Sequence, residues 1–318
     1  MNNIPWTEKY RPDNFNNIIL NNNAKSFFNN IFEKKHFPNL LLYGPPGTGK
    51  TTTIINLINK YQDIYSKRSN SLIIHLNASD DRGIDIIRNN IYNFVKTNNL
   101  FDDGIKFVIL DEVDFMTHIA QIALKCLMQE FNENVRYCLI CNYISKIDYS
   151  LQHEFIKIRF DKLPKKSIQH FIKNILSKES NGSQKKGHVN SATINNIIDY
   201  YETDVRSMIN YLQTNSCPMP TKTNILNNKI YEKIFLCHTQ KTERQFKNCL
   251  DKIVVTYKTN ISIVIKKYVA YLIRNKYDII YTKNIDIINE LEYIIHNIEL
   301  VTNENKDIYM NLLYYSIV

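Results

Sequence analysis

Short, mainly apolar runs alternate with amphipathic stretches through the first half of the chain. Each run is four or five residues long: Leu40–Tyr43, Leu72–Leu76, Phe107–Leu110 and Tyr137–Cys141. Apolar strands separated by helical segments are typical of a parallel sheet that is covered by helices on both faces. The pattern therefore predicts an α/β domain over residues 1–162.

The pattern changes in the last third of the chain, where helix-breaking residues disappear. The last glycine is Gly187 and the last proline is Pro220. Beyond them, apolar residues recur at helical spacing, as at Ile261, Val264, Ile265, Tyr268, Val269 and Leu272. Residues 221–318 are therefore predicted to form an all-helical domain.

Two breaks, at Leu163–Pro164 and at Cys217–Pro220, set off a middle segment. Within residues 163–220, helical patterns flank a polar loop, 178–187, that we expect to be disordered or mobile. The chain thus divides into a sheet domain, a small helical domain (163–220) and the larger helical domain.

Composition narrows the class of protein without fixing a function. The net charge of +9 is compatible with a nucleic-acid or acidic-protein partner. The abundance of Asn, Lys, Ile and Tyr also fits A/T-rich codons, so the basic balance has a second explanation. No apolar stretch reaches the ~18 residues of a membrane span. Because the N-terminus lacks a secretory pattern, we expect a protein that stays inside the cell.

Six cysteines are scattered through the chain, and Cys138 and Cys141 form a C-x-x-C. Residues three apart on a strand point to opposite faces of the sheet. No second pair with metal-ligand spacing accompanies them. We therefore expect reduced, core-packed thiols and no metal or redox role for this motif.

The sequence from Gly44 to Thr51, GPPGTGKT, matches the phosphate-binding motif G-x-x-x-x-G-K-[ST] and lies between a predicted strand and a predicted helix over 51–61. Its glycines allow backbone N–H groups to cradle phosphate oxygens at a helix N-terminus. Lys50 is expected between the β- and γ-phosphates, with the Thr51 hydroxyl on Mg²⁺. The residues predicted to bind nucleotide here are Gly44, Pro45, Pro46, Gly47, Thr48, Gly49, Lys50, Thr51 and Thr52.

Polar residues follow the next apolar runs. Asp111 and Glu112 end the run that begins at Phe107, and strands of open α/β sheets deliver such carboxylates beside the phosphate loop. We expect Asp111 to hold Mg²⁺ through water and Glu112 to orient or deprotonate the attacking water. Asp114 is expected in a structural or network role. Asn142 ends the following run, where its amide is either a γ-phosphate sensor or a strand-terminal turn residue.

Several segments together resemble the small subunits of replication factor C, the sliding-clamp loader of the AAA+ class. The segments are Pro5–Pro12 (PWTEKYRP), Leu76–Gly83 (LNASDDRG), Cys141–Tyr143 and the phosphate loop with its preceding Leu-Leu-Leu-Tyr. The stretches 80–88 and 138–146 are most similar to the subunit numbered 3 or 5. The resemblance covers residues 1 to about 160 closely and continues faintly to Asn303–Glu304.

The resemblance implies an AAA+ domain, a helical lid and a helical collar that assembles a heteropentamer. It implies ATP and Mg²⁺ as cofactors and an ATPase activity in which Lys50, Glu112, Asn142 and Arg206 are catalytic. It implies a sliding clamp, primer-template DNA and the other loader subunits as partners, no membrane, and a nuclear location.

Further residue roles also come from the resemblance. Tyr10, Arg11 and Pro12 would line the adenine pocket, and Arg206 matches the second sensor, which reaches the phosphates from the lid. Arg82 and Arg88 would touch DNA phosphates without reading sequence. For Arg88, a solvated helix face is the alternative.

One position departs from the family. Small subunits carry Ser-Arg-Cys after the first sensor, and its arginine is given to the ATP of the neighbouring subunit. Here Glu154 replaces that arginine, in Leu151–Phe160. Three explanations stay open: the neighbouring site needs no turnover, Lys157 or Arg159 substitutes, or the sequence is divergent or mis-assigned here.

Two other functions stay open beside an ATPase of a clamp loader. The chain could be a nucleotide-binding scaffold subunit with little turnover. Glu154 favours this function, whereas four intact residues favour turnover at the chain's own site: Lys50, Asp111, Glu112 and Asn142. It could also be a different AAA+ DNA motor, against which the Trp6–Pro12 segment and the helical C-terminal domain count.

Overall fold

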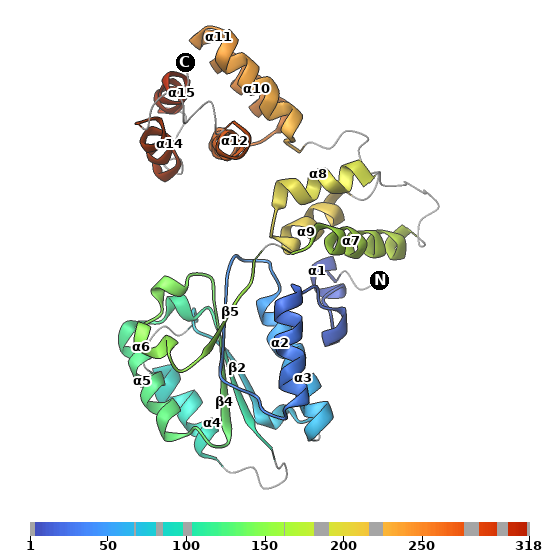
Figure 1. Cartoon of the computed structure of the whole chain (residues 1–318), viewed down its shortest axis with the longest axis vertical. Helices are drawn as coiled ribbons and strands as arrows, with labels where there is room; N and C mark the ends of the chain where they lie inside the picture. The colour runs from blue at the N-terminus through green and yellow to red at the C-terminus, as the bar shows by residue number, and fades with distance from the viewer. Residues whose placement is uncertain are drawn as a thin grey trace. The chain divides into compact units, whose positions relative to one another are not determined.

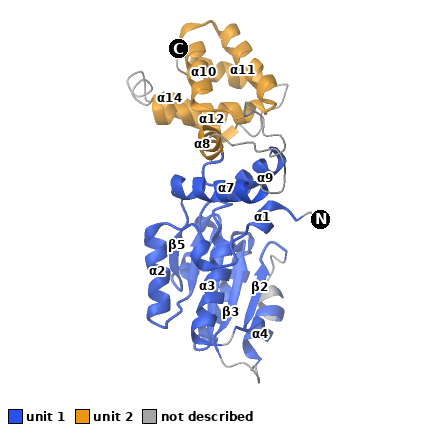
Figure 2. Ribbon diagram, turned by 90° about the vertical axis from the view of Figure 1, so that its right-hand side faces the viewer, with its two compact units in different colours: residues 1–188, 201–219 blue, residues 189–200, 220–318 orange. Residues whose placement is uncertain are grey.

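The computed structural model describes residues 4–66, 68–80, 85–97, 104–161, 163–180, 191–215, 225–276, 286–297 and 305–316. The chain forms two compact units (Figure 2). The first contains residues 1–188 and 201–219, and the second contains residues 189–200 and 220–318. The three-domain division expected from the sequence stays a prediction. Among the described residues, no helix is both long and apolar enough to cross a bilayer.

The first unit is built on a five-stranded parallel sheet with the strand order β2-β3-β4-β1-β5. The strands are β1 (Leu40–Tyr43), β2 (Ile73–Asn77), β3 (Lys106–Asp111), β4 (Val135–Cys141) and β5 (Ile156–Arg159). Four of them lie where the apolar runs predict strands. The predicted parallel α/β architecture is therefore confirmed.

Helices and helical turns connect these strands. They are α1 (Trp6–Lys9), η1 (Phe15–Asn17), α2 (Asn22–Glu33), α3 (Lys50–Tyr65), η2 (Asn70–Leu72), η3 (Ile86–Ile91), α4 (Tyr92–Lys96), η4 (Val113–Phe115), α5 (His118–Glu130), η5 (Ile144–Lys146), α6 (Tyr149–Gln152), α7 (Lys165–Ser180) and α9 (Val205–Asn215). Helix α8 (Ser191–Tyr201) belongs to the second unit except for its last residue.

The strands carry apolar side chains on both faces because helices cover both (Figure 1). In β1, Leu40 and Leu42 pack into one core with α2 and α3, while Leu41 packs into a second core with α4 and α5. Cys138 and Cys141 of β4 divide between the same two cores. The prediction that these thiols face opposite sides of the sheet is confirmed, and burial raises the pKa of both, that of Cys141 to about 12.

The second unit contains α10 (Asn228–Gln240), α11 (Glu243–Tyr257), α12 (Ile261–Asn275), α14 (Asp286–Asn297) and α15 (Lys306–Tyr315). Every regular element described beyond residue 225 is a helix, as predicted. The apolar stripe predicted along α12 is buried, and five of its six residues are fully inaccessible: Ile261 is 8% exposed, while Val264, Ile265, Tyr268, Val269 and Leu272 are 0% exposed. His238 of α10 lies in this core, with its ring nitrogens 3.0 Å from the Tyr268 hydroxyl and from the Tyr314 carbonyl oxygen.

The segment predicted to be a polar loop overlaps the end of a helix. Helix α7 continues through Ser180, three residues into the predicted loop 178–187, and within this overlap Glu179 is in contact with the N-terminal segment. Residues 181–190 lie outside the described part of the chain, and so does the predicted linker at Cys217–Pro220.

Candidate nucleotide-binding site

The phosphate loop joins β1 to α3. At two positions of the loop, the backbone conformation and the nearby atoms leave room only for glycine. Gly44 has φ 142°, and a Cβ there would lie 2.1 Å from the Phe160 carbonyl oxygen. Gly47 has φ 73°, and its Cβ would lie 2.0 Å from Asp204 Oδ1. The loop is therefore packed against β5 on one side and against the start of α9 on the other, and Val205 N donates to the Gly47 carbonyl oxygen at 3.3 Å.

Lys50 opens α3 and is buried, with its ammonium turned back over the loop. Its Nζ donates to the carbonyl oxygens of Gly44 (2.7 Å) and Pro45 (2.9 Å) and to Asn142 Oδ1 (2.9 Å). Burial lowers the pKa of Lys50, and the nearby Asp111 carboxylate opposes that shift. The Lys50 ammonium is thus held at the phosphate loop by neutral oxygen acceptors. Phosphate oxygens, which are charged, would form stronger hydrogen bonds with it.

Thr51 and Asp111 meet at the ends of α3 and β3. Thr51 Oγ1 donates to Asp111 Oδ2 at 2.6 Å, so the two residues predicted to hold a metal ion are brought together. A hydroxyl and a carboxylate are hard oxygen donors of the kind that Mg²⁺ prefers, and the pair therefore fits that ion. Among the described residues, no group of three or more His, Cys, Asp or Glu side chains is arranged so that it could hold a metal ion by itself.

Glu112 follows Asp111 in a left-handed conformation with φ 56°. Such a conformation costs a non-glycine residue about 1–2 kcal/mol and is concentrated at functional sites. The backbone N–H of Glu112 donates to Asp111 Oδ1 at 2.9 Å, which fixes the turn. Asp114 is buried in the next turn, and its two carboxylate oxygens have no hydrogen-bond partner among the described residues.

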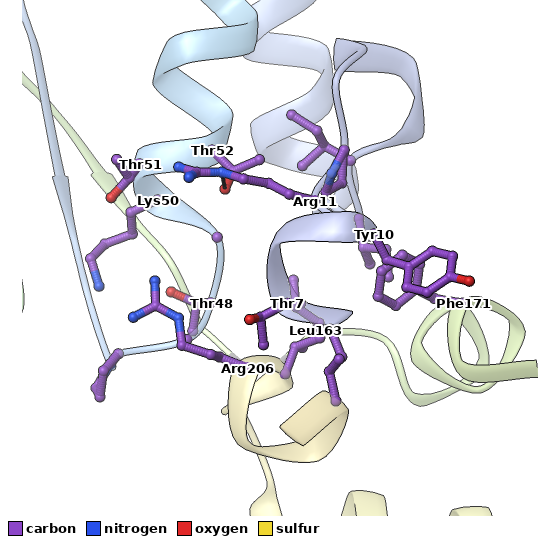
Figure 3. A pocket seen from close by; sticks show the side chains of 18 of the residues that line it. Thr7, Tyr10, Arg11, Thr48, Lys50, Thr51, Thr52, Leu163, Phe171 and Arg206 are labelled. Carbon is purple, nitrogen blue, oxygen red and sulfur yellow. Dashed lines mark hydrogen bonds between the residues drawn. The ribbon is translucent and has the colours of Figure 1, made fainter. Parts of the chain in front are cut away.

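A pocket of about 230 Å³ lies over the loop (Figure 3). Side chains of Lys50 and Arg206 both reach into it, and the charge of Arg206 lowers the pKa of Lys50 further. Predicted site residues that line it are Tyr10, Arg11, Pro12, Pro46, Gly47, Thr48, Gly49, Lys50, Thr51, Thr52, Asp111, Glu112, Asn142 and Arg206. The remaining residues predicted to bind nucleotide, Gly44 and Pro45, accept hydrogen bonds from Lys50 through their carbonyl oxygens.

The N-terminal segment closes one side of the pocket. Arg11 Nε donates to Thr52 Oγ1 at 3.2 Å, which ties the segment to α3. The Tyr10 hydroxyl and Lys9 Nζ both donate to Glu179 Oε1 near the end of α7, Lys9 at 2.6 Å. Burial raises the pKa of Tyr10, and the bond to Glu179 adds to the rise. The adenine-pocket segment predicted at residues 10–12 is thus fastened to α7 as well as to α3.

Sequence reasoning missed several residues of this site. The apolar side of the pocket is formed by Leu163, which precedes α7, by Phe171 of α7 and by Ile209 of α9. In the sequence, all three have the pattern of ordinary core residues. Glu179 lay in the predicted polar loop, and no sequence signal connects it to Tyr10. Asp204 precedes α9, where a cap is a recognisable signal, but its contact with Gly47 is not.

Of three further residues that the sequence singles out, only Glu154 has a described side chain. Arg82 lies outside the described residues, and of Arg88 only the backbone, within η3, is described, so both DNA contacts stay predictions. Glu154 lies between α6 and β5, where its backbone N–H donates to the Leu151 carbonyl oxygen at 3.1 Å and Gln129 Nε2 lies 3.5 Å from its carboxylate.

Comparisons with known proteins agree with this geometry. Residues 40–162 match the family described as "ATPase family associated with various cellular activities (AAA)". The chain is 38% identical to replication factor C subunit 5 of Homo sapiens over 251 residues, which cover 78% of this chain and 69% of the relative. It is 36% identical to replication factor C subunit 3 of Saccharomyces cerevisiae over 232 residues, covering 72% of this chain and 66% of the relative. The aligned part thus spans about two thirds of these relatives' length.

Proposed function

Because the chain belongs to the replication factor C small subunits of the AAA class, in the group of subunits 3 and 5, we propose that it binds and hydrolyses ATP within a heteropentameric DNA sliding-clamp loader. Its partners are the other loader subunits, the clamp and primer-template DNA, which it holds through the backbone. It acts in the nucleus, in replication and repair. ATP binding shifts the complex toward a closed state only by as much as ATP binds the closed state more tightly than the open state.

One observation carries this proposal above the others. Two hydrogen bonds join the phosphate loop to the ends of neighbouring strands: Lys50 to Asn142 and Thr51 to Asp111. A lysine, a hydroxyl, a carboxylate and an amide therefore converge at one edge of the sheet. That is the set of groups needed to hold a nucleoside triphosphate with its metal ion.

Each residue has a distinct part in the proposed reaction. Lys50 leaves the loop carbonyls to bind the β- and γ-phosphates, and Arg206 reaches the same phosphates from α9. Glu112 orients the attacking water and accepts its proton, while Asn142 holds that water or the γ-phosphate. Thr51 and Asp111 would hold Mg²⁺, which would neutralise phosphate charge when bound.

The test is Lys50→Ala in the reconstituted pentamer. Loss of one charge-assisted contact of about 1.5–3 kcal/mol is expected to weaken binding of a fluorescent ATP analogue more than about tenfold and to impair clamp loading. Lys60→Ala, on the same helix but outside the pocket lining, is the charge-matched control. If clamp loading by the Lys50→Ala pentamer is unchanged, the scaffold function remains and the ATPase function of this subunit is refuted. ATP-dependent capture by a sliding clamp separates a clamp loader from another AAA+ DNA motor.

Glu154 stands where the family's trans-acting arginine is expected, and we infer that this chain does not stimulate its neighbour's hydrolysis. Arginine fingers raise rates by about 10³–10⁵-fold, whereas a carboxylate repels phosphate charge. Of the alternative donors, Arg159 Nε is paired with Asp161 at 2.8 Å, and Lys157 is exposed on the edge strand β5.

The variant Glu154→Arg tests that inference. If the neighbouring site needs no finger, the clamp-stimulated ATPase of the pentamer is expected to stay unchanged. Lys50→Ala, measured in the same assay, shows that the assay detects the loss of one active site. A clear rise in the rate of Glu154→Arg would mean that the neighbouring site can use a finger that Glu154 does not supply, and the explanation that this site needs no finger would be wrong.

A further inference from the structure

Two cysteines of the second unit line one pocket, and the nucleotide site uses neither of them. Cys237 lies on α10 and Cys249 on α11, and both are partly exposed free thiols. The pocket has a volume of about 430 Å³ and is also lined by Lys233, Lys241 and Lys252. The two thiols therefore share a polar, solvent-reachable environment.

The helices that carry these thiols form a hairpin whose connection is only Lys241 and Thr242 (Figure 2). Such a short connection makes the two helices antiparallel neighbours. The pocket-facing residues recur at helical spacing on each helix: Ile230, Lys233 and Cys237 on α10, continued by Lys241 just after it, and Gln245, Asn248, Cys249, Lys252, Ile253 and Tyr257 on α11. Each cysteine thus occupies the middle of the stripe that faces the other helix.

Side chains beside the thiols confirm that the helices touch at this level. The rings of His238 and Phe246 lie 4.5 Å apart between centroids, directly next to Cys237 along α10 and one turn from Cys249 along α11. Buried residues of α10 and α11 pack into the same hydrophobic core, which fixes how far the two helices are shifted along each other.

The two thiols line the same pocket from neighbouring helices and interact with each other. Burial, together with the neighbouring Cys237 thiol, raises the pKa of Cys249 to about 11, while Lys241 and Lys252 oppose the rise. A raised pKa keeps Cys249 protonated, and the thiolate is the reactive form of cysteine, so Cys249 is poorly suited to attack an oxidant first.

We propose that Cys237 and Cys249 are a reversible dithiol–disulfide pair, a redox modification site that links α10 to α11. With a hydroperoxide as oxidant, the Cys237 sulfur attacks the peroxide oxygen, the O–O bond breaks, and Cys237 becomes a sulfenic acid while water or an alcohol leaves. The Cys249 sulfur then attacks the Cys237 sulfur, an S–S bond forms, and water leaves. Two thiols lose two electrons and two protons in total, and the peroxide gains them.

The other described cysteines differ in ways that make them internal controls. Cys138 and Cys141 are close in sequence but are buried on opposite faces of the sheet. Cys126 is exposed on α5 and lies in the first unit. Exposure alone therefore predicts oxidation of Cys126, whereas pairing predicts a link between Cys237 and Cys249.

The test oxidises the full chain under native conditions with hydrogen peroxide, blocks remaining thiols and digests with trypsin. Cleavage after lysine places the two cysteines on separate peptides, 234–241 and 248–252. The expected product is these two peptides joined by a disulfide, which dithiothreitol or thioredoxin releases. Cys237→Ser and Cys249→Ser are each expected to abolish the joined product, and Cys126→Ser to leave it unchanged.

A sulfenic-acid probe tests the order of the steps. In Cys249→Ser the second step is blocked, so the probe is expected to accumulate on Cys237. The proposal is overturned if both peptides stay unlinked while Cys126 is oxidised at the same peroxide dose. It is also overturned if the linked product forms only in denaturant, or if neither cysteine of the pair takes up the probe in the Ser variants. Circular dichroism of each variant confirms that the helices have formed before oxidation.

Discussion

Replacing Gly47 with alanine tests whether the phosphate loop and the start of α9 form one packed structure. The backbone of Gly47 has φ 73°, which costs an alanine about 1–2 kcal/mol. The added Cβ would also lie 2.0 Å from Asp204 Oδ1, 2.7 Å from its Cγ and 3.0 Å from its Cα. Because a backbone atom is among these contacts, rotation of the Asp204 side chain alone cannot relieve the overlap.

The overlap has a second consequence, because Asp204 caps α9. Its carboxylate accepts from the Ser207 N–H at 3.0 Å and from the Ser207 hydroxyl at 2.6 Å. Losing such a cap costs about 0.5–2 kcal/mol. Gly47→Ala is therefore expected to lower the free energy of unfolding of the first unit by about 1.5–4 kcal/mol, the sum of the two costs. Displacement of Asp204 also shifts Arg206, so the affinity for ATP should fall.

The control is Gly49→Ala in the same loop. Gly49 has φ 88°, so it carries the same backbone cost, but a Cβ there would meet nothing within 4 Å. Urea unfolding followed by fluorescence of Trp6, the single tryptophan, reports on the first unit alone. Gly47→Ala should be the more destabilising of the two, and Asp204→Ala should reduce the difference in a double-mutant cycle. Equal destabilisation by both glycine substitutions would refute the contact between the loop and Asp204.

Three further changes test other parts of the first unit. Hydrogen bonds, chiefly from the Ser150 side chain and also from His118, lower the pKa of Asp148 to about 2. The ionised Asp148 carboxylate therefore stabilises the fold fully above the ordinary carboxyl pKa of about 4, and this stabilisation is lost as the pH falls through about 2. Asp148→Asn should make Tm depend less on pH in that window. Glu179→Ala removes the partner of Tyr10 and should raise the Kd of a fluorescent ATP analogue about 2- to 12-fold, whereas an unchanged Kd would show that nucleotide binding does not depend on this bond. Asp114→Asn removes a buried carboxylate that lacks a described partner, so urea unfolding should show higher stability; a loss of stability would mean that the carboxylate has a stabilising role.

The sheet could be predicted from the sequence because its strands are buried on both faces. All residues of the run Phe107–Leu110 are apolar, which indicates a strand that is buried on both faces. The observed β3 begins only one residue earlier and ends one residue later. The parallel arrangement then fixes the site, since the carboxyl ends of β1, β3 and β4 lie at one edge of the sheet. The order of strands and polar residues along the chain is therefore enough to place Asp111 and Asn142 beside Lys50.

Contacts between distant segments could not be predicted in the same way. Glu179 and Tyr10 are 169 positions apart, and Glu179 stands at the start of a stretch whose polarity suggested a loop. Cys237 and Cys249 have no recognisable motif spacing, because their pairing comes from the turn between two helices rather than from one element. In each case tertiary packing determines which residue becomes the partner, and the local sequence pattern carries no information about it.

The backbone around Glu154 also bears on what the substitution there means. Leu151 and Phe155, on either side of it, are 1% and 7% exposed, and Gln152 Nε2 donates to the carbonyl oxygens of Ile144 and Ile147 at 3.1 and 2.9 Å. The loop is thus anchored independently of the Glu154 side chain, which lies partly exposed. A change from arginine to glutamate at such a position alters the charge offered to a neighbouring molecule without requiring the fold to change. In the chain's own pocket, Lys50 contacts Asn142 and Thr51 contacts Asp111. Under the proposed function, the substitution would therefore separate the two sides of a nucleotide site: the groups proposed to bind ATP within this chain are in place, and the group proposed to face the adjacent subunit is reversed in charge.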